Sequence, residues 1–194
     1  HNITDLADLM KVSEQMPPVL MREYGGPSDL MAVFTRPATA TELTPRDFEF
    51  VAEDVAVMSR LLGNAVERKV PGVNVLLYGP PGTGKTELAK VCAGLAGLEL
   101  YEVEYADRDG NSLTGRDRYR SLQISQVFLK GSARVALLFD EVEDVFPTLP
   151  SDTAQLMARL DASDAQGSNS VSGKAWVNQI LESNPVPVIW ITNR

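Results

Sequence analysis

Short apolar runs, bounded by polar residues, glycine or proline, recur along the chain from residue 73 onward. A run of about five such residues is typical of a strand that is buried on both faces of a sheet. Three runs of this kind, and one stretch in which apolar and polar residues alternate, predict strands. The predicted strands are Val73–Tyr78, Leu98–Glu104, Val135–Phe139 and Val188–Thr192.

Stretches with apolar residues at helical spacing lie before and between these runs, and most end near a glycine. Because strands and helices alternate, we expect an α/β fold with helices on both faces of a parallel sheet. The Ser- and Gly-rich stretch Ala162–Gly173 predicts a mobile loop between the last two strands. The predicted helices are Pro45–Arg68, Lys85–Leu95, Asp117–Leu129 and Lys174–Glu182.

Residues 1–43 follow a different pattern, because prolines and glycines interrupt them repeatedly. We expect short helices joined by turns there, so residues 1–43 are interpreted as a small, mostly helical or irregular N-terminal segment. Thr44 can cap the helix that follows, and Asp47 stands where the acid of a capping box belongs. The α/β domain is therefore predicted over residues 44–194.

The composition is that of an acidic globular protein, in which 18 Lys and Arg against 26 Asp and Glu give a net charge of −8. Such a chain binds nucleic acid or an anionic membrane only through a local basic patch, so we expect neither partner. The densest basic stretch, Arg116, Arg118 and Arg120, is interpreted as a solvated helix face. The single cysteine, Cys92, permits no internal disulfide and suits the reducing cytoplasm. The single histidine, His1, argues against imidazole catalysis.

The glycine-rich stretch after the first predicted strand carries the clearest chemical signal. Its sequence, GPPGTGKT, has the spacing G-x-x-x-x-G-K-[ST] between a strand and a helix. Its glycines allow main-chain N–H groups to point inward around phosphate oxygens, and the helix N-terminus adds its positive dipole. Lys85 then supplies a charge for the β- and γ-phosphates of a nucleoside triphosphate, and Thr86 supplies a hydroxyl for Mg²⁺. The predicted nucleotide-binding residues are Gly79, Pro80, Pro81, Gly82, Thr83, Gly84, Lys85, Thr86 and Glu87.

Acidic residues follow the apolar run Val135–Phe139, at the end of the strand where ligands bind in parallel sheets. Asp140 is predicted to bind Mg²⁺, and Glu141 to orient and polarise the attacking water. Two acids that end a strand and cap a helix are the alternative interpretation. The neighbouring Glu143 and Asp144 are interpreted as surface or helix-cap acids.

The segments GPPGTGKT, LLFDEVED and WITNR, in this order, resemble the Walker A, Walker B and sensor-1 segments of AAA+ ATPases. The resemblance implies a three-layer α/β/α P-loop fold with the strand order 5-1-4-3-2, followed by a helical lid. It assigns the catalytic roles to Lys85, Glu141 and the sensor-1 residue Asn193, and the Mg²⁺ ligands to Thr86 and Asp140. Taken alone, Asn193 is more often an ordinary turn residue.

AAA+ ATPases bind ATP between neighbouring subunits of a ring, usually of six, and most use hydrolysis to remodel proteins. The resemblance places the fifth strand, the arginine finger, the lid and sensor 2 beyond Arg194. We therefore expect the 194 residues alone to bind nucleotide weakly and to hydrolyse it very slowly. Protein-threading relatives carry an aromatic residue at the place of the segment NSLTG, where this chain has Leu113, so threading through a pore is not predicted.

The leading hypothesis is an ATP-hydrolysing remodelling module that acts with other copies of itself on an unknown protein substrate. The alternative is a nucleotide-gated scaffold, in which binding sets a conformation and hydrolysis is slow or incidental. A DNA-acting member of the family is disfavoured by the acidic charge.

Overall fold

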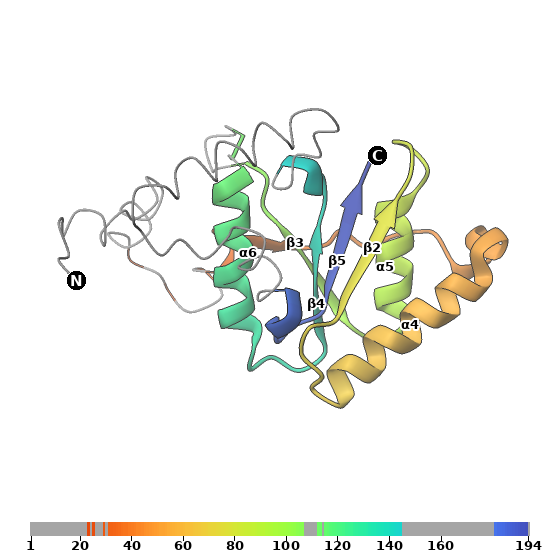
Figure 1. The fold of residues 1–194 in the computed structure, drawn as a ribbon, viewed down its shortest axis with the longest axis horizontal. Helices are drawn as coiled ribbons and strands as arrows, with labels where there is room; N and C mark the ends of the chain where they lie inside the picture. Colours follow the sequence, from red (N-terminus) through yellow and green to blue (C-terminus); the bar gives the residue numbers. More distant parts are fainter. Residues whose placement is uncertain are drawn as a thin grey trace, which may run out of the picture.

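The computed structural model describes most of the α/β domain. The described residues are 31–106, 112–113, 115–144 and 181–193, together with Glu23, Gly25 and Asp29. The predicted loop Ala162–Gly173, the predicted helix Lys174–Glu182 up to residue 180, and Arg194 lie outside them. In the described part, a central sheet separates helices on its two sides, as Figure 1 shows.

Within the described residues, five strands form one mixed sheet in the order β1-β3-β4-β5-β2. Strands β3, β4, β5 and β2 pair in parallel, and β1 is antiparallel to β3. Strands β2, β3, β4 and β5 confirm the four predicted strands. In the order β3-β4-β5-β2 they correspond to strands 2, 3, 4 and 1 of the predicted order 5-1-4-3-2. The bounds are Thr35–Pro37 (β1), Asn74–Tyr78 (β2), Glu99–Val103 (β3), Val135–Phe139 (β4) and Val188–Thr192 (β5).

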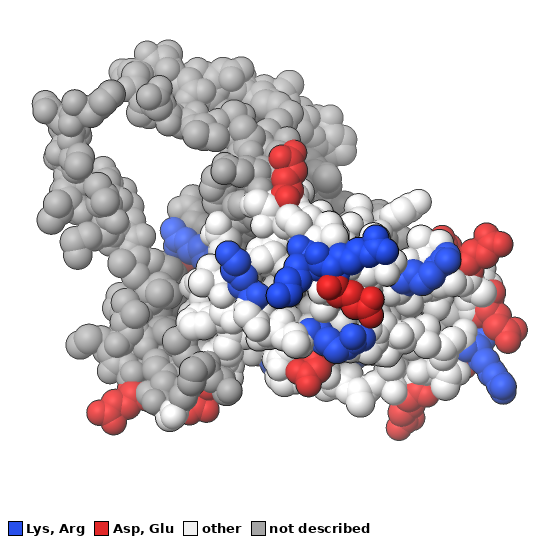
Figure 2. All heavy atoms as spheres, turned by 90° about the horizontal axis from the view of Figure 1, so that it is seen from below, with Lys and Arg blue, Asp and Glu red and all other residues white. Residues whose placement is uncertain are grey.

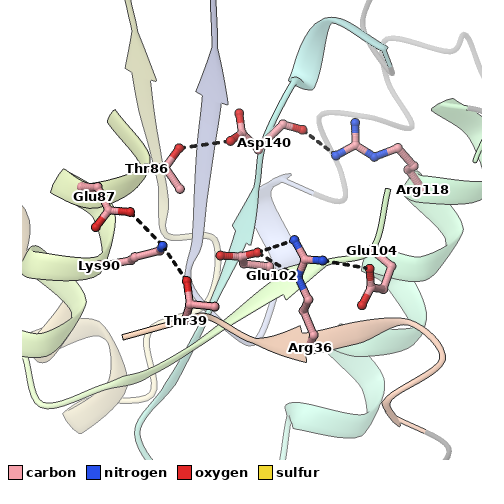
Figure 3. Close-up of polar contacts among 9 residues, drawn as sticks. All are labelled: Arg36, Thr39, Thr86, Glu87, Lys90, Glu102, Glu104, Arg118 and Asp140. Atoms are coloured by element: carbon pink, nitrogen blue, oxygen red, sulfur yellow. Dashed lines mark hydrogen bonds and ion pairs between the residues drawn. The ribbon is translucent and has the colours of Figure 1, made fainter. Parts of the chain in front are cut away.

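Strand β1 was not expected from the sequence, and it lies within the predicted N-terminal segment. A run of three residues that ends at Pro37 is too short to show a period, so its pairing depends on contacts across the sheet. Arg36 reaches the carboxylates of Glu102 (2.9 Å) and Glu104 (3.8 Å) on and beside β3 (Figure 3). The sheet therefore begins upstream of Thr44, the predicted start of the α/β domain.

Three of the predicted helices are described, with one change at the first. In place of a continuous helix from Pro45, a 3₁₀ helix precedes α4 and is interrupted at Phe48 (φ −118°, ψ 25°), which is buried in the core. The Thr44 backbone N–H donates to Asp47 Oδ2 (2.7 Å), which confirms the predicted capping-box acid. The bounds are Pro45–Val51 (η1), Ala52–Glu67 (α4), Lys85–Leu95 (α5), Gly115–Leu129 (α6) and Val142–Asp144 (η2). In the described part of the chain, no helix has the length and hydropathy that a membrane crossing requires.

The sheet separates two hydrophobic cores, one beneath α4 and α5 and the other beneath α6 (Figure 1). Strand β4 is buried at all of its positions and contributes to both cores. Its residues alternate, with Ala136 and Leu138 in the first core and Val135, Leu137 and Phe139 in the second. This arrangement explains why its sequence is a continuous apolar run.

A pair of asparagines ties the start of β2 to the segment before β5. Asn74 Nδ2 donates to the Leu181 carbonyl (2.7 Å) and to Asn184 Oδ1 (3.1 Å), and Asn184 Nδ2 donates to the Val186 carbonyl (2.7 Å). The Gly72 N–H donates to the Asn184 carbonyl (2.9 Å). These hydrogen bonds hold the starts of β2 and β5 side by side, next to the first hydrogen bonds of the sheet between them.

Gly72→Ala is expected to destabilise the fold, because Gly72 has a φ of 75° and a Cβ there would lie 2.5 Å from the Glu182 carbonyl oxygen. A left-handed backbone at a non-glycine residue costs roughly 1–3 kcal/mol by itself, and the clash adds to this cost. Gly94→Ala is the matched control, since Gly94 lies in α5 and, outside the backbone of that helix, no atom of the described residues lies within 4 Å of its Cβ position. That change should stabilise the protein by about 0.5–1 kcal/mol.

Urea denaturation of both variants measures the free energy of unfolding. Equal values for Gly72→Ala and Gly94→Ala would contradict the close approach of Gly72 to the Glu182 backbone.

Candidate nucleotide-binding site

The candidate site begins at the glycine-rich bend, residues 79–84, where β2 ends and the chain turns into α5. Gly79, Gly82 and Gly84 all have positive φ values (142°, 78° and 82°), in the region that favours glycine. Apart from the adjacent residues of the chain, no described atom lies within 4 Å of the place that a Cβ would take at Gly79 or Gly82. The predicted turn of main-chain groups is therefore formed, and the space beside these two glycines is not filled by neighbouring side chains.

The first two residues of α5 contact different partners. Lys85 Nζ donates to the main-chain carbonyls of Gly79 (2.9 Å) and Pro80 (2.8 Å), so its ammonium group lies against the bend. Thr86 Oγ1 donates to Asp140 Oδ2 (3.1 Å), a contact that Figure 3 shows between α5 and the end of β4. Although 54 residues separate them in sequence, Thr86 and Asp140 meet because β2 and β4 both pair in parallel with β5.

The acidic turn, Asp140 and Glu141, follows β4 directly. Both carboxylate oxygens of Asp140 accept hydrogen bonds, Oδ2 from Thr86 and Oδ1 from the Glu141 backbone N–H (2.8 Å). Glu141 is exposed and has a φ of 54°, in the left-handed region. The two acids are thus held differently: Asp140 is fixed against α5, and Glu141 faces solvent, where it could reach a water molecule.

The oxygen atoms of Thr86 and Asp140 fit Mg²⁺, which prefers oxygen ligands and in nucleotide sites takes only one or two from the protein. The remaining ligands of such an ion are phosphate oxygens and water. Among the described residues, no group of three or more His, Cys, Asp or Glu side chains could hold a metal ion. The oxygen atoms of Thr86 and Asp140 therefore suit a magnesium ion that is also bound by a phosphate. Among the described residues, no set of side chains would bind the ion without a nucleotide.

Arg118 is buried, which corrects the interpretation of the basic stretch as a solvated face. It is only 2% exposed, and its guanidinium donates from Nη2 to the Asp140 carbonyl (2.6 Å) and from Nη1 to the Glu141 carbonyl (3.3 Å). Arg120 agrees with the interpretation, because 38% of its side chain is exposed. The side chain of Arg116 lies outside the described part of the structure.

Strand β5 brings Asn193 to the same edge of the sheet as the bend and the acidic turn. The Asn193 backbone N–H donates to Glu143 Oε1 (3.2 Å), and Glu143 belongs to η2, just after the acidic turn. Glu143 is half-buried and fastens the end of β5, so its interpretation as a surface or cap acid is wrong. The side chain of Asp144 is outside the described residues.

Glu87 lies in the first turn of α5, and its carboxylate is engaged by a neighbour. Lys90 Nζ donates to Glu87 Oε1 (2.9 Å) and to Thr39 Oγ1 (3.0 Å), as Figure 3 shows. The hydrogen bond from Lys90 lowers the pKa of the Glu87 carboxyl below its ordinary value. The nucleotide contact predicted at this position stays a prediction, and it would come from the backbone N–H of Glu87.

The residues of this site lie in the part of the chain that matches a known family. The family model described as "ATPase family associated with various cellular activities (AAA)" matches residues 75–194. The chain is 36% identical over 109 residues to the ATP-dependent zinc metalloprotease FtsH of Aster yellows witches'-broom phytoplasma, covering 55% of this chain and 14% of that protein. It is 33% identical over 130 residues to FtsH of Lactococcus lactis, covering 62% and 16% of the two chains.

A relative with a different name covers more of the chain. Replication factor C small subunit 2 of Pyrobaculum islandicum is 30% identical over 156 residues, covering 76% of this chain and 45% of that protein. The chain therefore spans less than half the length of each of these relatives. The family match runs from β2 through the glycine-rich bend, the acidic turn and the end of β5, which is most of the chain. On this evidence the chain belongs to the AAA family of ATPases.

Proposed function

We propose that this chain hydrolyses ATP with Mg²⁺ and that hydrolysis drives the remodelling of a protein or protein complex. The observation that carries the proposal is the contact between Thr86 and Asp140, which joins an open glycine-rich bend to a pair of acids. A glycine turn or a pair of acids at a strand end is common by itself. Their meeting at one point is what a nucleoside triphosphatase requires.

Each residue has a role that follows from its position. Main-chain N–H groups of the bend and the Lys85 ammonium bind phosphate oxygens, and Thr86 and Asp140 hold the metal. A Mg²⁺ ion held by these two residues would supply positive charge that stabilises the phosphates. Glu141 orients a water molecule and accepts a proton from it as the water oxygen attacks the γ-phosphorus and the bond to the departing ADP oxygen breaks. Asn193, at the end of β5, contacts the γ-phosphate or that water.

We further propose that the site lies between neighbouring copies of the chain in a ring, usually of six in the AAA+ ATPases that the chain resembles. An arginine supplied by a neighbour contributes roughly 10³–10⁵ in rate in well-studied triphosphatases. For this reason separate, unassembled copies of the chain are expected to hydrolyse ATP slowly. The proposed substrate is a protein or protein complex, with no more specific identity. The single, buried Cys92 suits a reducing compartment such as the cytoplasm.

Two other functions compete with this proposal. In a nucleotide-gated scaffold, binding alone would set the conformation. The exposed Glu141 beside the fixed Asp140 favours hydrolysis, because a scaffold needs no acid that positions water.

A DNA-acting role would need a basic surface. Figure 2 shows Lys and Arg side chains gathered among Asp and Glu on the face where the strands begin, at the sheet edge opposite the candidate site. The mixed charge of that face and the net charge of −8 favour a protein substrate.

Lys85→Met is expected to weaken the binding of an ATP analogue roughly 10–100-fold, because charge-assisted hydrogen bonds contribute about 1.5–3 kcal/mol. The fold should persist, since the described contacts of Lys85 go to carbonyls of the bend. Lys130→Met is the matched control, because Lys130 is exposed just after α6, away from the bend. Calorimetric titration with a nonhydrolysable analogue gives the affinities, and equal values for the two variants would contradict the assigned role of Lys85.

Glu141→Gln should leave ATP binding intact and lower hydrolysis about 10²–10⁴-fold, the usual contribution of a general base. In the longest natural form of the protein, the rate of phosphate release per subunit should rise steeply with protein concentration, because neighbours complete the sites. A flat rate near zero would favour the scaffold. Robust turnover by the 194 residues alone, lost in Glu141→Gln, would refute the view that further parts are essential.

A further inference from the structure

Arg118 carries its charge into the protein interior, since only 2% of the residue is exposed. Removal of a guanidinium from water is unfavourable unless hydrogen bonds and favourable charges replace the lost hydration. An apolar residue at this position of α6 would avoid that cost. The contacts of Arg118 therefore show what the buried charge accomplishes.

The guanidinium of Arg118 acts on the backbone of the acidic turn. Nη2 donates to the Asp140 carbonyl (2.6 Å) and Nη1 to the Glu141 carbonyl (3.3 Å), and the guanidinium lies 4.6 Å from the centre of the Phe139 ring. Hydrogen bonds from a charged donor are stronger than those between neutral groups, and the face of an aromatic ring attracts a cation. Figure 3 shows Arg118 and Thr86 approaching Asp140 from opposite sides.

The acidic turn has a conformation that needs support from its surroundings. Glu141 has a φ of 54°, which non-glycine residues rarely adopt and which persists only where neighbouring groups hold it. Asp140 Oδ1 accepts the N–H of Glu141, and Arg118 binds the carbonyls of both residues. The main-chain groups of the turn are thereby occupied, and the Asp140 carboxylate stays against Thr86 while Glu141 faces solvent.

We propose that Arg118 is a positioning residue for ATP hydrolysis. It fixes the acidic turn so that the carboxylate of Asp140 faces the metal position beside Thr86 and that of Glu141 faces the attacking water. This inference rests on the proposed function. A displacement of about 1 Å can lower a rate about 100-fold, whereas phosphate binding is assigned to the bend and to Lys85, in the connection from β2 to α5. The expected signature is therefore a loss of kcat with little change in nucleotide affinity.

The test uses two substitutions of Arg118 in the longest natural form of the protein. Arg118→Met keeps an unbranched apolar stem and removes every donor, and Arg118→Lys keeps the charge but loses the planar fork that reaches two carbonyls. Arg120→Ala is the matched control, an arginine two residues away whose side chain is 38% exposed. Phosphate release gives kcat, and titration with a nonhydrolysable ATP analogue at saturating Mg²⁺ gives Kd.

Arg118→Met should lower kcat about 10–100-fold, and its Kd should stay within about threefold of the unsubstituted value, the pattern of an interaction needed only for the chemical step. Arg118→Lys should give an intermediate kcat, and Arg120→Ala should resemble the unsubstituted protein. An unchanged kcat in Arg118→Met would overturn the proposal, and so would a loss of kcat matched by an equal loss of affinity.

Failure of this inference can be told apart from failure of the proposed function. If the unsubstituted protein binds the analogue but does not hydrolyse ATP, the proposed function fails and the positioning role falls with it. If the unsubstituted protein hydrolyses ATP and Arg118→Met does so equally well, only the positioning role fails. If Arg118→Met does not fold, the Arg118→Lys variant decides. An unchanged kcat and Kd in that variant would overturn the proposal that hydrogen bonds to both carbonyls are needed for hydrolysis.

Discussion

Parallel pairing of β2, β5 and β4 is the constraint on which the candidate site depends. Because neighbouring strands run in the same direction, their carboxyl ends meet at one edge of the sheet. The strands end at Tyr78, Phe139 and Thr192, so the glycine-rich bend, the acidic turn and Asn193 leave the sheet at adjacent points. If β5 ran antiparallel to its neighbours, Asn193 would lie at the edge of the sheet opposite the bend and the acidic turn.

The two cores hold this edge in place. Strand β4 contributes to both cores, so a shift of the acidic turn would disturb the packing on both faces of the sheet. Phe139, the last residue of β4, packs against Trp190 with ring centres 5.3 Å apart and also lies beneath the Arg118 guanidinium. The polar contacts of the acidic turn therefore rest on a rigid apolar base, which is where a strained Glu141 can be maintained.

The parts that could be predicted from the sequence are those with a local cause. Strands β4 and β5 are read from apolar runs because burial on both faces leaves no polar position. Strand β2 has a similar run although Leu76 and Tyr78 are exposed, and the glycine-rich bend is read from its spacing. That the bend, the acids after β4 and the end of β5 meet also follows, since parallel strands bring their ends together. The catalytic roles of Lys85, Glu141 and Asn193 remain predictions, because they depend on a bound nucleotide.

The parts that could not be predicted depend on contacts between distant segments. Strand β1 is three residues long, and its pairing is decided by β3. Arg118 and Arg120 were given one environment because they stand close together in sequence, yet Arg118 shares the buried face of α6 with Leu122, four residues on, and Arg120 does not. The signal available in the sequence was helical spacing, since Arg118 stands four residues before the apolar Leu122. The local composition could not show that Arg118 is buried, because a charge run is usually solvated.

The two hydrogen bonds from Lys85 to carbonyls of the bend have a consequence for ligand exchange. Two of the three ammonium donors already have partners at Gly79 and Pro80, so an incoming anion that takes more than one donor must displace a carbonyl oxygen. A polyphosphate with several charges compensates for that displacement better than a single small anion does. In the proposed reaction, the return of the lysine to these two carbonyls after cleavage would favour the departure of the released phosphate.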